Sequence, residues 1–245
     1  MAKFDYIVSD LHLGAVPQAT ERAFIEFLRS ITPAAKSLLI NGDLFDFWFE
    51  WGDVIPSEHY RVLAALADVV DAGVPVTMLG GNHDAWGGRF LRERVGITLH
   101  DGVVRTEFGG KPALVAHGDG LGKGDLKYRM LKKVLRSKPL IWGFRAIHPE
   151  VGMRIARGVS STDEKIQRDH NSSTRAQFLE HWAREQLAED ASLGFVVCGH
   201  SHVPVLMEIS PGRFYINSGD WIKHRTYVTV DAAGQPQMLE YTATS

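Results

Sequence analysis

Ten polar side chains that could bind metal ions or move protons fall in five short segments, each directly after an apolar run. In chain order they are Asp10 and His12, Asp43 and Asp46, Asn82, His83 and Asp84, His117, and His200 and His202. Carboxylate, imidazole and amide groups in one set suit divalent cations of intermediate hardness, so we expect Mn, with Fe or Zn as alternatives. The set is large enough for two ions about 3.5–4 Å apart, as in two-metal hydrolases.

The spacing inside these segments favours a shared site. In Asp10-Leu11-His12 the middle residue can point away, so that the two polar side chains face the same way, and His200-Ser201-His202 repeats this pattern. Glycines flank several of the segments and permit tight turns. One such motif alone is usually a simple turn, but five in order after five strands are hard to obtain by chance.

The apolar runs predict eight strands and two helices, which must position these side chains. The predicted strands are 4–9, 37–41, 75–79, 112–116, 194–198, 205–209, 214–217 and 226–230, and the predicted helices are 19–31 and 57–72. Because the carboxyl ends of strands form the ligand crevice of open α/β sheets, the five segments should converge there. Alternating strands and helices, followed by clustered strands, indicate a layered α/β fold.

The stretch from Leu121 to about His170 interrupts this alternation. It has a helical pattern and is too long for an ordinary connection, so we interpret it as a helical cap inserted into one domain, residues 1–245. Between Lys123 and Gly158 it carries ten lysines and arginines against two carboxylates, in a chain of net charge −2. Large apolar residues alternate with the basic ones, which suits an anionic amphiphile or an anionic membrane surface. The alternative is a helical hairpin that packs on the sheets with solvated lysines.

The composition excludes several other classes of protein. The chain has 245 residues, of which 44% are hydrophobic, and one cysteine, so a disulfide framework is excluded. No stretch approaches the roughly 20 apolar residues of a membrane span, and the start does not read as a signal peptide. We expect a cytoplasmic protein with weak peripheral association at the inner face of the inner membrane.

In their order, the five motifs resemble those of the calcineurin-like metallophosphoesterases. That family shows Asp-x-His, Gly-Asp-x-x-Asp, Gly-Asn-His-Asp, a lone His and Gly-His-x-His, and the match runs from about residue 5 to about residue 220. The resemblance implies an α/β fold, a four-layer αββα sandwich with a helical cap. The ligands that it implies are Asp10, His12, Asp43 and His202 for one metal, and Asn82, His117, His200 and the shared Asp43 for the other.

We expect two catalytic residues, His83 from the resemblance and Asp84 from its place beside His83. His83 would face the substrate, where it would stabilise the transition state or protonate the leaving group. Asp84 would orient His83 by accepting a hydrogen bond from it. The alternative for Asp84 is a structural role, as the cap of the next helix.

Further segments resemble the UDP-2,3-diacylglucosamine pyrophosphohydrolases. These segments are residues 42–50, residues 117–125, Tyr128 with Lys132-Lys133, His148-Pro149 and 219–221. Those enzymes act in lipid A biosynthesis and cleave a nucleotide-linked diacyl sugar to UMP and a diacyl sugar phosphate. The substrate contacts implied by this resemblance are Asn82, His83, Asp125, Tyr128, Lys132, Ser161 and Lys165. His83 is a departure, because much of that family has arginine there.

Other functions stay open at this point. Another phosphoesterase of the same fold could act on phosphoprotein or on nucleic acid, with stacking on Phe45, Phe47, Trp48, Phe49 and Trp51. A scaffold that has lost catalysis and a membrane-surface adaptor are further alternatives. Because every expected ligand position holds a competent residue, we favour the hydrolase, with a nucleotide-linked diacyl sugar as its partner and no nucleic acid.

Overall fold

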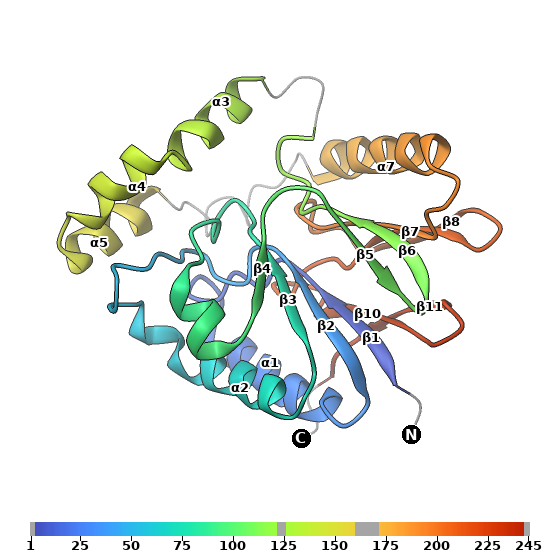
Figure 1. The fold of residues 1–245 in the computed structure, drawn as a ribbon, viewed down its shortest axis with the longest axis horizontal. Coiled ribbons are helices and arrows are strands. Elements are labelled where there is room, and N and C mark those ends of the chain that lie inside the picture. The colour runs from blue at the N-terminus through green and yellow to red at the C-terminus, as the bar shows by residue number, and fades with distance from the viewer. Residues whose placement is uncertain (1–2, 122–125, 160–171, 243–245) are drawn as a thin grey trace.

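The computed structural model describes residues 3–121, 126–159 and 172–242. Two β-sheets stack face to face, and helices cover both outer faces (Figure 1). The core therefore lies in three layers, one between the sheets and one under each set of helices. The predicted four-layer αββα sandwich is confirmed.

The first sheet has the order β11–β10–β1–β2–β3–β4, in which β1 to β4 are parallel. Its strands are β1 (Phe4–Val8), β2 (Ala35–Asn41), β3 (Val76–Leu79), β4 (Thr98–His100), β10 (Thr226–Val230) and β11 (Pro236–Glu240). Helices α1 (Gln18–Ile31) and α2 (Tyr60–Asp71) pack on its outer face through residues such as Phe24 and Leu66. A 3-10 turn, η1 (Ser57–His59), precedes α2, and a π-helical turn, η2 (Leu91–Val95), precedes β4.

The second sheet has the order β5–β6–β7–β9–β8, in which β6, β7 and β9 are parallel. Its strands are β5 (Val104–Phe108), β6 (Lys111–Val115), β7 (Phe195–Cys198), β8 (Val205–Ser210) and β9 (Arg213–Asn217). Helix α7 (Ser172–Glu189) covers its outer face and buries Leu179 and Leu187 there. Between the sheets, Ile7 and Leu39 pack with Phe195 and Ile216.

In the part of the chain that the structure describes, three strands and one α-helix were not predicted from the sequence. Strand β5 exposes its three central residues, and β4 has only three residues, so neither shows a continuous apolar run. Strand β11 lies at the edge of the first sheet, and each of its residues stays partly or fully exposed. Helix α7 is rich in polar residues, which hides its apolar stripe from periodicity arguments.

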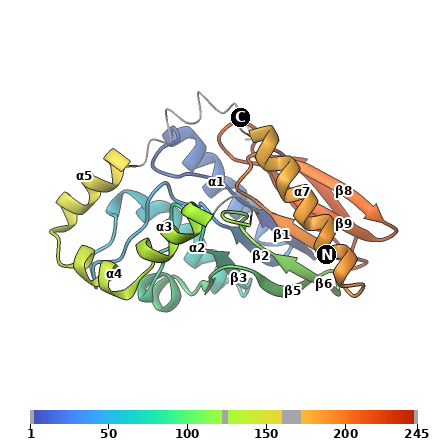
Figure 2. The same cartoon turned by 90° about the horizontal axis from the view of Figure 1, so that it is seen from above.

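Among the described residues of the stretch predicted as an insert there are three helices, and they lie to one side of the sandwich (Figures 1 and 2). They are α3 (Leu126–Leu135), α4 (Lys138–Arg145) and α5 (Pro149–Val159). The ring of Phe144 in α4 lies 4.8 Å from that of Phe49 and 5.7 Å from that of Trp51. Phe45 and Trp48 are fully buried in the first core. Within the described ranges, no helix combines the length and the apolar character that a membrane crossing requires.

Candidate metal centre and active site

The five predicted segments meet at the carboxyl ends of β1, β2, β3, β6 and β7. Their possible ligand atoms form three overlapping groups, and within each group the atoms lie within 4.8 Å of one another. The groups are Asp10 with His12 and His202, His12 with Asp43 and His83, and Asp43 with His117 and His200. Asp43 belongs to two of the groups, so its carboxylate stands between two possible cation positions.

Hydrogen bonds between the loops hold this arrangement together. The backbone N–H groups of Leu11 and His12 donate to the carbonyl of Asp43 at 2.9 and 3.0 Å. The carboxylate of Asp10 accepts from the N–H of His200 at 3.0 Å, and that of Asp43 accepts from the N–H of His83 at 2.9 Å. Each of the two carboxylates therefore fixes a second loop besides its own.

Five of the predicted ligands have left-handed backbone conformations. Among the described residues, six that are not glycine have a positive φ, and only Arg225 of the six is not a predicted ligand. The other five are Asp10 (φ 54°), His12 (48°), Asp43 (52°), His200 (63°) and His202 (59°). Such conformations cost roughly 1–2 kcal/mol per residue and concentrate at functional sites. The surrounding hydrogen bonds hold the ligands in these conformations.

Two glycines make room for the ligands. Gly42 has φ +85°, and a Cβ there would overlap the imidazole of His117. A Cβ on Gly81 would overlap the carboxylate of Asp43. The glycines before Asp43 and Asn82 are therefore needed for close packing, and Gly42 is also needed for the turn.

The backbone sets the orientation of the His117 ring. Its Nδ1 lies 2.8 Å from the carbonyl oxygen of Asn41, to which it donates, so Nε2 is the free nitrogen and faces Asp43 Oδ2 at 3.2 Å. Burial lowers the pKa of His117, but the Asp43 carboxylate outweighs it and raises the pKa to about 10, so a cation that binds at Nε2 must displace a proton. Burial and the charge on His117 lower the pKa of His200 to about 3, so His200 is a neutral imidazole that can bind a cation.

Asp220 is a residue of this site that the sequence analysis did not assign. Its Oδ2 lies 3.6 Å from Nδ1 of His202, whose Nε2 faces Asp10. The N–H groups of Lys223 and His224 donate to Oδ1 of Asp220 at 2.7 and 3.1 Å. Asp220 follows β9, which is parallel to β7, so the strand-end rule that found the other residues also applies to it.

His83 lies beside the shared carboxylate with one ring nitrogen already engaged. Its Nδ1 lies 2.9 Å from the carbonyl oxygen of Asp46 and 3.4 Å from the Oδ1 of the same residue. Burial lowers the pKa of His83, but the charge on Asp43 and the contacts with Asp46 raise it to about 9. For Asp43 itself, burial would raise the pKa, but the imidazoles around it, led by His117, hold it well below the usual range.

Asp84 binds backbone rather than the His83 ring. Its carboxylate accepts hydrogen bonds from four N–H groups, those of Asp43 (3.2 Å), Leu44 (2.7 Å), Phe45 (3.2 Å) and Gly81 (2.9 Å). The predicted hydrogen bond from His83 to Asp84 is wrong, because His83 turns toward Asp46. Asp84 also caps none of the described helices, and instead it ties the loop after β2 to the loop after β3.

The predicted substrate-binding residues are only partly described. Lys132 lies beside the site, with Nζ 2.6 Å from Oδ2 of Asp119, and Asn82 and His83 lie within it. Asp125, Ser161, Lys165 and the side chain of Tyr128 lie outside the described part of the chain.

The donor atoms of the site fit divalent cations. His12 Nε2, Asn82 Oδ1 and His117 Nε2 are buried and make no hydrogen bond within the described residues. Buried polar atoms nearly always have a partner, and cations would supply one here. The mixture of carboxylate, imidazole and amide donors agrees with this interpretation.

Together, the αββα sandwich and this set of strand-end ligands define a class of protein. A model of the calcineurin-like phosphoesterase family matches residues 6–204, and the chain belongs to that family. The protein is accordingly a metal-dependent hydrolase.

Proteins named UDP-2,3-diacylglucosamine hydrolase are similar to this chain over nearly its whole length. The one from Porphyromonas gingivalis is 29% identical over 248 residues, which cover 92% of this chain and 93% of that protein. The one from Edwardsiella ictaluri is 30% identical and covers 93% of this chain and 88% of that protein. The one from Vibrio vulnificus is 30% identical and covers 93% of both.

Proposed function

We propose that the protein hydrolyses the pyrophosphate bond of UDP-2,3-diacylglucosamine, giving UMP and 2,3-diacylglucosamine 1-phosphate for lipid A biosynthesis. The observation that carries this proposal is the extent of the similarity to hydrolases named for that substrate, which covers 92–93% of the chain. A match of that extent cannot omit the segment with α3, α4 and α5. The similarity therefore includes the part of the chain best suited to an acylated substrate.

Two divalent cations, with Mn favoured, fit the overlapping ligand groups. Asp10, His12 and His202 would hold one, Asn82, His117 and His200 would hold the other, and Asp43 would contact both. When bound, such ions supply Lewis acidity and a water activated at neutral pH. Asp43 keeps its negative charge for this role, because its pKa lies well below the usual range.

His83 serves the reaction as a proton donor. Its Nδ1 is engaged by Asp46, so the other ring nitrogen is available to a phosphoryl or leaving-group oxygen. Burial lowers the pKa of the ring, but the charge on Asp43 and the contacts with Asp46 raise it to about 9, which favours the protonated ring in the protein without bound cations. Proton donation from such a group typically contributes about 10²–10⁴-fold to a rate.

The three helices beside the sandwich form the cap that receives the acyl chains. They expose large apolar side chains, among them Met130 (61% exposed), Val134 (57%) and Trp142 (75%). Exposed basic residues, such as Lys138 and Arg145, accompany them. The same surface favours weak peripheral association of a cytoplasmic protein with an anionic membrane.

Product analysis tests the proposed function. The Mn-loaded protein would be incubated in parallel with UDP-2,3-diacylglucosamine, with single-stranded DNA and with a phosphopeptide. We expect UMP and the diacyl sugar phosphate from the first, and neither nucleotide ladders nor free phosphate from the others. Cleavage of DNA or of the phosphopeptide without UMP release would overturn the proposal in favour of another phosphoesterase. A purified protein that binds no metal would favour a scaffold.

A further inference from the structure

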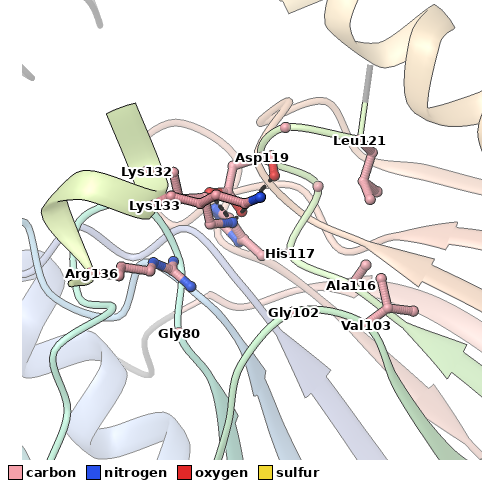
Figure 3. Close-up of a pocket in the computed structure, with 12 residues that line it drawn as sticks. Gly80, Gly102, Val103, Ala116, His117, Asp119, Leu121, Lys132, Lys133 and Arg136 are labelled. Carbon is pink, nitrogen blue, oxygen red and sulfur yellow. Dashed lines mark hydrogen bonds and ion pairs between the residues drawn. The ribbon is translucent and has the colours of Figure 1, made fainter. Parts of the chain in front are cut away.

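A cavity of about 500 Å³ opens beside the second ligand group, next to His117 (Figure 3). Its size lies within the range of small-molecule sites. Helix α3 forms one side with three basic residues, Lys132, Lys133 and Arg136. Loops rich in glycine, together with Val103 and Leu121, form the other side.

Two contacts direct the basic side of α3 toward the metal-binding loops. Lys132 Nζ lies 2.6 Å from Oδ2 of Asp119, two residues after His117. Arg136 donates to the carbonyl oxygen of Gly81 at 2.8 Å and also contacts Asp101 at 3.4 Å. Across the described ranges, no carboxylate is paired with Lys133, so its positive charge stays available to an anion. A phosphate group placed here would lie next to the catalytic loops.

The opposite wall suits a flat, uncharged group. Val103 is 48% exposed, so it presents apolar surface to the cavity. Gly80, Gly102, Gly118 and Gly120 add backbone without side chains, which leaves a smooth wall. The planar base of a nucleotide could lie against such a wall while the phosphate of the nucleotide faced the basic side chains of α3.

The acyl chains of the proposed substrate fit the surface of α3, α4 and α5 better than they fit the cavity. The large apolar side chains that α3, α4 and α5 expose, such as Met130, Val134 and Trp142, do not line the cavity. The three basic side chains that line the cavity would also disfavour a hydrocarbon chain there.

We propose that this cavity binds the nucleotide half of the substrate, with its phosphate toward Lys133 and its base against Val103 and Leu121. The inference rests on the proposed function, in which UMP is the leaving product. It divides the substrate between two sides of the metal centre, with the nucleotide in this cavity and the acyl chains at the cap.

Titration of the Mn-loaded protein with UMP tests this inference without turnover. Removal of a charge-assisted contact in Lys133→Ala should weaken UMP binding by about tenfold or more. The matched control is Lys138→Ala, which removes an exposed lysine of the same insert outside the cavity and should leave the affinity unchanged. Equal UMP affinity in both variants and in the unmodified protein, or no saturable binding at all, would overturn the inference.

A second pair of variants tests the opposite wall. Val103→Glu places a negative charge at the rim and should weaken UMP binding, whereas the similarly sized Val103→Gln should not. Uridine and inorganic phosphate serve as separate competitors. If phosphate competes as well as UMP and uridine does not compete at all, the assignment of the base to this cavity is wrong.

Two further measurements separate this inference from the proposed function. All four variants should retain the metal content of the unmodified protein, which shows that the metal centre is intact. Failure of the unmodified protein to release UMP from UDP-2,3-diacylglucosamine would overturn the proposed function. The UMP titration would still support or overturn the assignment of the cavity.

Discussion

Asp220 contacts the ring nitrogen of His202 that is not turned toward Asp10, and its Oδ2 lies 3.6 Å from Nδ1 of that ring. The other nitrogen, Nε2, lies 3.6 Å from Oδ1 of Asp10. A carboxylate at Nδ1 selects the tautomer whose Nε2 lone pair is free, which is the form that binds a metal. We therefore expect Asp220 to position His202 within the candidate ligand group of Asp10, His12 and His202.

Substitution of Asp220 should weaken metal binding without unfolding the protein. In Asp220→Asn, Oδ1 can still accept from the N–H groups of Lys223 and His224, but the amide can donate to Nδ1 and favour the wrong tautomer. We expect a metal affinity about 10–100-fold lower, measured by competition with a chelator. Unchanged affinity in this variant would contradict the positioning role. The thermal midpoint of the metal-free protein provides the control for folding.

Asp43→Ala should affect both cation positions, because Asp43 belongs to a ligand group on each side. We expect metal content to fall at both positions and turnover to drop by at least about a hundredfold. Elemental analysis of the purified variant gives the metal content. Asp53→Asn is the matched control, since Asp53 is a 95% exposed carboxylate on the same connection after β2. Near-normal turnover with normal metal content in Asp43→Ala would show that Asp43 does not bridge the ions.

His83→Asn should lower turnover while leaving metal content and stability close to normal. The imidazole contacts Asp46 and has a nitrogen within 4.8 Å of the shared carboxylate, but its role in the proposed reaction is proton donation. We expect a loss of about 10²–10⁴-fold in kcat. A variant that loses its metal ions together with its activity would instead show that His83 is a ligand.

Asp84→Asn should lower the stability of the protein, which is the reverse of the result expected for His83→Asn. Four backbone N–H groups donate to the carboxylate, and an amide nitrogen in place of one oxygen would leave some of them without an acceptor. We expect the free energy of unfolding to fall by about 1–3 kcal/mol, measured by urea denaturation. If Asp84→Asn loses activity at unchanged stability, the carboxylate has a catalytic role after all.

The exposed apolar side chains of the cap predict binding to anionic vesicles. Trp142→Glu should lower the fraction that sediments with phosphatidylglycerol vesicles by about tenfold, because burial of a large apolar side chain is lost. Tyr60→Glu is the control, since Tyr60 is 59% exposed on α2, outside the cap. Higher salt should weaken the binding of the unmodified protein. Equal binding to neutral and anionic vesicles would contradict a charge-assisted membrane contact.

The segments that meet at the candidate metal centre could be located from the sequence because their chemistry restricts the residue types and because each follows a recognisable strand. Asp43 and His117 stand out by residue type and position alone. Asp220 does not stand out in this way, because it contacts an imidazole rather than a metal. The strand before it was nevertheless predicted. Its partner depends on β9 lying beside β7, and that order is set by the packing of the sheets.

Asp84 shows a second limit of sequence arguments. Its place next to His83 suggested a contact between neighbours, but consecutive side chains in a tight loop point in different directions. The backbone N–H groups that it binds come mainly from the loop after β2, some 40 residues earlier in the chain. Helix α7 and strand β5 were missed for a different reason, since each buries only a narrow side and shows mostly polar residues.

The left-handed ligands have a consequence for the evolution and design of this fold. At the positions of Asp10, His12, Asp43, His200 and His202, a glycine would adopt the observed backbone with less strain than the residue present. Function and foldability therefore favour different residues at the three histidine positions, whereas the carboxylates of Asp10 and Asp43 also hold neighbouring loops. A search for more stable variants that ignored catalysis would replace these histidines first, and would produce a more stable protein without activity.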